Sequence, residues 1–191
     1  NSSEYTNEIT NDEVFKDLYS TIGVAMLEDV KKYKEGLLKL KGTEDYTDSV
    51  IKQLALFDQI GELNLKNIRS IAKSPVMVYV YGSSINSIKT KLGYTLGVDP
   101  LVDAISKISE LEKEGVFNEE YDKLKEFIDL LVPDENKQYK DELGKAIPED
   151  MPMWEKWLHL DISEKLIKEL KGFTDSMFGG PIENAFNDRF G

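Results

Sequence analysis

Residues 10–30 read Thr10-Asn-Asp-Glu13-Val-Phe-Lys-Asp-Leu-Tyr-Ser-Thr-Ile-Gly-Val-Ala-Met-Leu-Glu-Asp-Val30. Thr10 and Glu13 have the spacing of a capping box, which marks the start of a helix. Apolar residues then recur at steps of three to five, which is the pattern of an amphipathic helix. This pattern predicts one long helix over about 11–40. Its expected apolar members are Val14, Leu18, Ile22, Ala25 and Val30.

Helical periodicity continues along the rest of the chain, and no alternating strand pattern of any length appears. Proline removes a backbone donor and clashes with the preceding turn, so Pro75 predicts a kink or restart. Asp99-Pro100 predicts a new helix start, and Gly179-Gly180-Pro181 predicts a break. The region 133–152 is the most linker-like. The sequence therefore predicts an all-α fold, an irregular helical bundle. Its further helices are expected at 47–60, 63–81, 99–114, 118–131, 153–158, 162–177 and 182–190.

The net charge is −12, which argues against nucleic-acid binding by the whole surface. Residues 63–98 nevertheless contain no Asp or Glu, and they contain five cations. Such a local strip of positive charge can attract and bind an anion even though the protein as a whole is acidic. The alternative is a chance gap in the acidic residues. The five cations are Lys66, Arg69, Lys73, Lys89 and Lys91.

Other compositional features limit the possible classes of protein. There is no cysteine, which fits a reducing compartment and excludes thiolate metal sites. No apolar run is long enough to cross a membrane. The only histidine, His159, is expected to be a packing or surface residue rather than a ligand. The acidic pairs at 12–13 and 119–120 stand at helix starts, where the helix dipole favours them. The chain begins without Met, as an excised fragment would.

One segment has a spacing that suggests chemistry: Arg69-Ser-Ile-Ala-Lys73-Ser-Pro-Val-Met77-Val-Tyr-Val-Tyr81-Gly82-Ser83. Steps of four place Arg69, Lys73, Met77 and Tyr81 within an arc of about 120° on a helix. Two cations one turn apart can grip a triphosphate, since arginine offers a planar fork and lysine a mobile charge. Tyr81 offers a ring for a base and a hydroxyl for a sugar. Gly82 permits a sharp turn. Taken alone, however, such a pair of cations is more often only a solvated helix face.

This segment resembles the fingers nucleotide-binding helix of the single-subunit RNA polymerases of bacteriophages and mitochondria. The family pattern is Arg-x3-Lys-x3-Met-x3-Tyr-Gly. The chain departs from it at Val78, where Thr is usual, and at Pro75. Related DNA polymerases usually carry an aromatic residue at the position of Met77, so the resemblance favours the RNA branch. The matching positions are Arg69, Lys73, Val76, Met77, Tyr81 and Gly82.

Two other segments show a weaker resemblance to the same family. Residues 7–19 are similar to the segment after the first catalytic carboxylate motif, and residues 180–186 to the helix before the last palm elements. The resemblance implies that residues 1–191 are a fragment of the fingers subdomain. Within it, 63–95 would be the nucleotide-binding helix and following turn, and 97–178 would be a helical region without an assigned place.

The resemblance also implies roles and partners. Arg69 and Lys73 would hold an incoming ribonucleoside triphosphate, Met77 would line the site, and Tyr81 would help to select ribose. Gly82 would let the template pass. Mg²⁺ would be held by palm aspartates outside this fragment, so the fragment should bind no metal, bind nucleotide weakly and be inactive alone. The partners would be the palm domain or subunit, the DNA template and the RNA product. We expect no membrane partner and a location in the cytoplasm of a phage-infected bacterium. The open alternatives are a related DNA polymerase and a non-enzymatic all-α interaction module.

Overall fold

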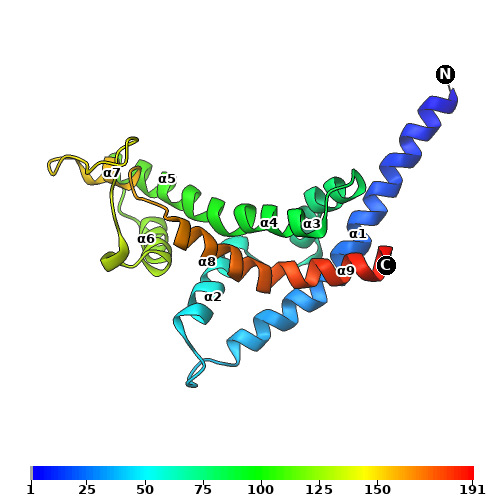
Figure 1. Ribbon diagram of the computed structural model, residues 1–191, viewed down its shortest axis with the longest axis horizontal. Coiled ribbons are helices and arrows are strands. Elements are labelled where there is room, and N and C mark those ends of the chain that lie inside the picture. The colour runs from blue at the N-terminus through cyan, green and yellow to red at the C-terminus, as the bar shows by residue number, and fades with distance from the viewer. Residues whose placement is uncertain (1) are drawn as a thin grey trace.

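Figure 1 shows a computed structural model, which describes residues 2–191, with side chains described from residue 13 onward. Over this range the chain forms helices and no strand, and pairing of the β type is limited to two isolated bridges. The predicted all-α class is confirmed. The helices are α1 (Ser2–Leu38), α2 (Asp48–Ile60), α3 (Leu65–Val80), α4 (Ile85–Gly93), α5 (Asp99–Lys113), α6 (Glu119–Leu131), α7 (Met153–Trp157), α8 (Glu164–Thr174) and α9 (Gly180–Phe190), with a 3₁₀ turn η2 (Asp134–Asn136) and two π-helical turns, η1 (Tyr94–Val98) and η3 (Asp175–Gly179).

The first helix, α1, is longer than its apolar pattern predicts, because its backbone is already helical at Ser2. A helix start at Asn11 is therefore wrong. The side chain of Thr10, half of the expected capping box, lies outside the described side chains, as does that of Asp12. Val14 and Ala25 were expected on the buried side and are exposed. Ala25 lies off the buried stripe, which advances in steps of four from residue 18. Val14 lies in line with that stripe, but the N-terminal part of α1 projects beyond the other helices in Figure 1. That stripe is Leu18, Ile22, Met26 and Val30.

Two long composite helices form the centre of the bundle and lie side by side in Figure 1. The first consists of α4, η1 and α5, and the second of α8, η3 and α9. Each π-helical turn directly precedes a proline-bearing turn, at Pro100 and Pro181. A proline ring clashes with the carbonyl four residues earlier in a regular helix, and a widened turn relieves this clash. α5 begins at Asp99 as predicted, but Asp99 does not cap a new helix, because the chain is already helical in η1. The predicted break at 179–181 is wrong, because the helix continues through Pro181.

The remaining elements pack around this central pair. α1 packs against α3 and α9 at one end, while α6 and α7 pack against α5 at the other. Aromatic rings fill the middle, where the ring centroids of Phe57 on α2 and Phe178 in η3 are 5.7 Å apart. Within the region 97–178, α5, α6 and α7 form the end of the bundle that lies away from α1, whereas η3 contacts α1. The predicted linker 133–152 is mostly irregular, and Lys140 pairs with Ala146 within it. None of the helices in the described range is both long and apolar enough to cross a membrane.

Candidate functional site

The α3 stripe, which we define as Arg69, Lys73, Met77 and Tyr81, lies beside the buried side of α3. Consecutive residues on a helix are separated by about 100°, so a residue that follows a buried one stands at the edge of the buried face. Each of the first three stripe residues follows a fully buried residue, and this holds the stripe at the rim of the helix contact with α1. The three pairs are Ile68–Arg69, Ala72–Lys73 and Val76–Met77.

A single open groove between α1 and α3 contains all four stripe residues. Its volume is about 920 Å³, near the upper end of the range for small-molecule sites. The predicted common accessible face is therefore present, whereas nucleotide binding by it stays a prediction. We call this space the α1–α3 groove. It is lined by Phe15, Lys16, Tyr19, Leu65, Lys66, Arg69, Ser70, Lys73, Met77 and Tyr81.

The described side chains that line the α1–α3 groove carry charge of one sign. Four of them are cations and none is a carboxylate. Among the described side chains, none of these four cations forms an ion pair. Cations that no carboxylate neutralises attract an anion more strongly, and the effect is greater where the surface is concave. The four are Lys16, Lys66, Arg69 and Lys73.

The cationic strip expected over 63–98 is divided between different surfaces. Lys89 lies outside the groove, 2.7 Å from Oε2 of Glu183 and 3.6 Å from Oδ1 of Asp175. The hydrogen bond to Glu183 is the main cause of a pKa above the usual value for lysine, and it outweighs burial, which lowers the pKa. Lys91 lines a different cavity, behind α3. Only Lys66, Arg69 and Lys73 of the strip therefore face the groove.

Arg69 is the most constrained cation of the α1–α3 groove. Its side chain is half-buried, and its Nε is buried without a hydrogen-bond partner in the described structure. A buried donor that lacks an acceptor is costly, and a ligand oxygen in the groove could reach this one after a movement of the side chain. The arrangement suits a phosphate, because guanidinium and phosphate can form paired hydrogen bonds.

Tyr81 and Gly82 end α3 at the mouth of the groove. Tyr81 is 77 % exposed, so its ring and hydroxyl are free to meet a ligand. Gly82 has a φ of 101°, in the region that favours glycine, and its N–H donates to the carbonyl of Tyr79. The N–H of Ser83 donates to the carbonyl of Val78, which completes a Schellman ending. The sharp turn expected at Gly82 is confirmed.

Pro75 neither breaks nor restarts α3, so the predicted restart is wrong, while the alternative of a kink stays a prediction. The ring of Pro75 is buried, and its lack of an N–H leaves the carbonyl of Ile71 without its usual helical donor. Both residues line a mainly apolar cavity of about 200 Å³ between α3, α4 and η1. The proline ring and the carbonyl that lacks a donor therefore lie on the side of α3 that faces away from the α1–α3 groove. The helical spacing of the stripe residues is preserved.

Sequence reasoning missed the contribution of α1 to the site. Phe15, Lys16 and Tyr19 line the groove opposite the α3 stripe, and the rings of Phe15 and Tyr19 stack with centroids 6.3 Å apart. Lys66 was identified only as part of the charged strip. The spacing of Phe15 and Tyr19 indicates a common helix face, but nothing in the sequence pairs that face with α3.

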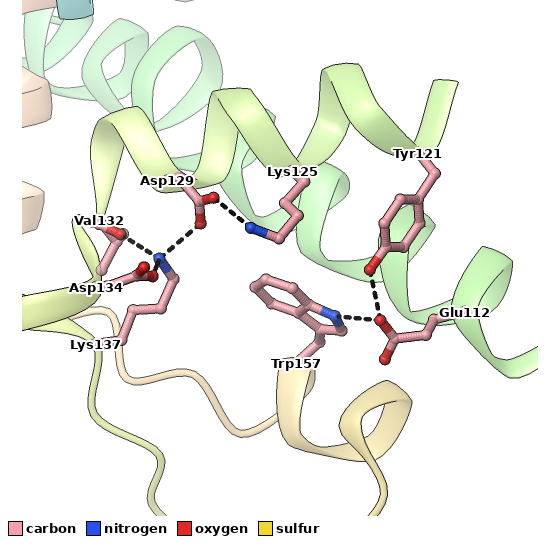
Figure 2. A network of polar contacts seen from close by, with 8 residues as sticks. All are labelled: Glu112, Tyr121, Lys125, Asp129, Val132, Asp134, Lys137 and Trp157. Carbon is pink, nitrogen blue, oxygen red and sulfur yellow. Dashed lines mark hydrogen bonds and ion pairs between the residues drawn. The ribbon is translucent and has the colours of Figure 1, made fainter. Parts of the chain in front are cut away.

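A second cluster of polar side chains, shown in Figure 2, joins α6 to η2 and the loop that follows it, at the other end of the bundle. Nζ of Lys137 lies 2.7 Å from both Asp129 and Asp134. Burial alone would raise the pKa of Asp129, but hydrogen bonds from Lys125 and Lys137 outweigh it and lower the pKa below the ordinary value. Because these charges neutralise one another, the cluster is a structural clamp rather than a binding site.

A separate set of hydrogen bonds in Figure 2 centres on Glu112 of α5, which accepts a bond of 2.6 Å from Tyr121 of α6 and one of 3.5 Å from Trp157 of α7. Burial, followed by the proximity of Glu112, raises the pKa of the Tyr121 hydroxyl. His159 is half-buried, and its Nδ1 lies 3.2 Å from the carbonyl oxygen of Lys140, which fits the expected packing or surface role. Within the described side chains, no three acidic or histidine residues gather to hold a metal ion. The residues of the α1–α3 groove do not fit a magnesium site either.

Comparison with known proteins gives one match. A family model described as "Bacteriophage N4 RNA polymerase, helical domain" matches residues 25–191, which includes α3 and all the elements that follow it. No curated protein and no solved structure matches the chain.

Proposed function

The chain belongs to the family of the bacteriophage N4 RNA polymerase helical domain, which agrees with its resemblance to the single-subunit RNA polymerases, and from this premise we propose that the α1–α3 groove binds the incoming ribonucleoside triphosphate. The observation that carries the proposal is the set of four cations that share this groove without an ion pair among the described side chains. A nucleoside triphosphate supplies the negative charge that such a groove lacks.

The positions of the stripe residues suit the parts of a nucleotide. Arg69 and Lys73 are one helical turn apart, so their cationic groups can hold successive phosphates. Tyr81 lies two turns beyond Lys73, at the open end of the groove, where its ring can lie beside a base and its hydroxyl can contact a ribose. Met77, which is 42 % exposed, supplies an apolar surface between them. Gly82 has open space around its Cα, which gives a template strand room to pass.

The reaction that fits this site is template-directed nucleotidyl transfer in the complete polymerase. Two metal ions in such a reaction stabilise the attacking and leaving oxygens. No carboxylate is among the described side chains that line the groove, and we propose that palm aspartates of the complete polymerase hold the magnesium. The work of this chain is to bind and orient the triphosphate and its base against the template. The proposed partners are the DNA template and the RNA product. The proposed location is the cytoplasm of an infected bacterium.

Titration of the ¹⁵N-labelled chain with ATP, monitored by nuclear magnetic resonance, tests this proposal, because the method detects weak binding and locates it. Shifts should concentrate on the groove residues of α1 and α3. Arg69→Ala and Lys73→Ala should each weaken binding about tenfold, as expected for one lost hydrogen bond to a charged group. Lys31→Ala is the matched control, because Lys31 is exposed on α1 and does not line the groove. Absence of shifts in the groove, or equal losses in all three variants, would refute nucleotide binding there.

Ribose selection can be tested in the polymerase that contains this domain. Tyr81→Phe removes one hydroxyl and keeps the ring, so it should relax the preference for ribonucleotides over deoxyribonucleotides while most activity remains. Steady-state incorporation of both substrates measures this ratio. Unchanged discrimination would remove Tyr81 from the sugar site.

A further inference from the structure

α1 and α3 approach each other closely where Gly23 meets Arg69. A Cβ atom placed on Gly23 would lie 3.1 Å from Cγ of Arg69, and 3.6 Å and 3.7 Å from its Cα and backbone nitrogen. The first distance is shorter than an ordinary carbon–carbon contact, whereas the other two are normal. Any larger residue at Gly23 would therefore displace the side chain of Arg69 and leave the backbone of α3 nearly in place.

The contact with Gly23 involves the side chain of Arg69, which is also a candidate ligand-binding group. Arg69 is half-buried, lines the α1–α3 groove and has a buried Nε without a partner in the described structure. The backbone of α1 at Gly23 lies beside the stem of the arginine, and Arg69 lines the groove. A side chain packed in this way loses less conformational freedom when it binds.

We infer that Gly23 is a positioning residue for the nucleotide site, and that its missing side chain lets α1 hold the stem of Arg69 so that the guanidinium faces a phosphate. This inference rests on the proposed binding of a triphosphate by Arg69. The inference assigns α1 a specific part in recognition: the helix fixes the geometry of a cation that belongs to α3.

Gly23→Ala in the 191-residue chain is the first test, again with ATP and resonance shifts as the readout. It should weaken ATP binding about tenfold, because a misplaced guanidinium loses roughly one charged hydrogen bond. AMP has one phosphate and ATP has three, so Gly23→Ala should weaken the binding of AMP less than the binding of ATP. The matched control is Gly36→Ala on the same helix, since a Cβ at Gly36 meets no atom within 4 Å. Gly36→Ala should leave ATP binding unchanged.

The double variant of Gly23→Ala with Arg69→Ala separates positioning from general damage. Arg69→Ala deletes the Cγ that the new methyl group would strike, so adding Gly23→Ala to it should cause no further loss of ATP affinity. Additive losses would overturn the inference, because they would show that Gly23 acts by another route. If Gly23→Ala alone does not fold, the double variant should recover the helical circular dichroism spectrum. Failure to recover it would likewise overturn the inference.

The outcomes also distinguish this inference from the proposed function. If the unaltered chain shows no ATP-dependent shifts in the groove, the proposed function fails. If the unaltered chain binds ATP and Arg69→Ala weakens binding, while Gly23→Ala does not, only the positioning role fails.

Discussion

The ring of Tyr79 on α3 lies 4.7 Å from the ring of Phe186 on α9, centroid to centroid. It also lies 5.1 Å from the ring of Phe190. Two residues later on the same helix, Tyr81 is exposed and lines the α1–α3 groove. Two tyrosines in the same short segment thus have separate tasks, since one joins α3 to α9 and the other is available to a ligand.

Replacement of these tyrosines should separate stability from binding. Tyr79→Ala should lower the free energy of unfolding by about 2–3 kcal/mol, because it removes a half-buried ring from an aromatic cluster. Tyr81→Ala should change that free energy by less than about 0.5 kcal/mol, as expected for an exposed residue. Urea denaturation of both variants measures the difference. Equal destabilisation would show that Tyr81 also belongs to the core.

Lys89 should contribute to stability and not to nucleotide binding, although it belongs to the same acid-free segment as Arg69. Lys89→Met should lower the free energy of unfolding by about 0.5–1 kcal/mol at neutral pH, because Glu183 and Asp175 lose their partner. The folded-state pKa of Lys89 is raised above 10.5, so the ion pair stabilises the fold below that pH and is lost as the pH rises through the raised value.

Urea midpoints of the Lys89→Met variant and the unaltered chain should therefore converge at strongly alkaline pH, while ATP binding at neutral pH stays the same. A marked loss of ATP affinity would place Lys89 in the nucleotide site after all.

The clamp in Figure 2 predicts a loss of stability in acid. The folded-state pKa of Asp129 lies below its ordinary value of 3.8, so its contribution is complete above that value and is lost as the pH falls through the lowered one. Asp129→Asn should cost about 1–2 kcal/mol at neutral pH, through weaker hydrogen bonds to Lys125 and Lys137. Denaturation at neutral pH and near pH 2 measures this, and a difference that persists unchanged in acid contradicts it.

Lys16 should strengthen nucleotide binding from the α1 side of the groove. Lys16→Ala should weaken ATP binding about three- to fivefold and make it less sensitive to salt, because one exposed cation is lost. Lys31→Ala serves as the control on the same helix, since Lys31 is exposed outside the groove. The ATP affinities of the two variants and of the unaltered chain, each measured at two ionic strengths, test this prediction. Equal behaviour of the two variants would mean that Lys16 acts only through the net charge.

The local sequence was sufficient to predict the helices, because the period of the apolar residues and the capping residues are local properties. Asn118 caps α6 through a hydrogen bond from the N–H of Tyr121, and Gly61 ends α2 with a φ of 87°. Prolines were the main source of error. Pro75, Pro100 and Pro181 all lie inside continuous helices, since π-helical turns or a neighbouring cavity accommodate the ring. Whether such accommodation exists depends on packing, which a local pattern does not contain.

By itself, the sequence determined the all-α fold and the stripe formed by Arg69, Lys73, Met77 and Tyr81, because residues four apart on any helix share a face. Only the tertiary structure decided what that stripe faces. Contacts between distant segments bring Phe15, Lys16 and Tyr19 opposite the stripe and place Gly23 against Arg69. They also pair Lys89 with Glu183, outside the groove. Such contacts depend on how whole helices pack, so no spacing within one helix could have revealed them.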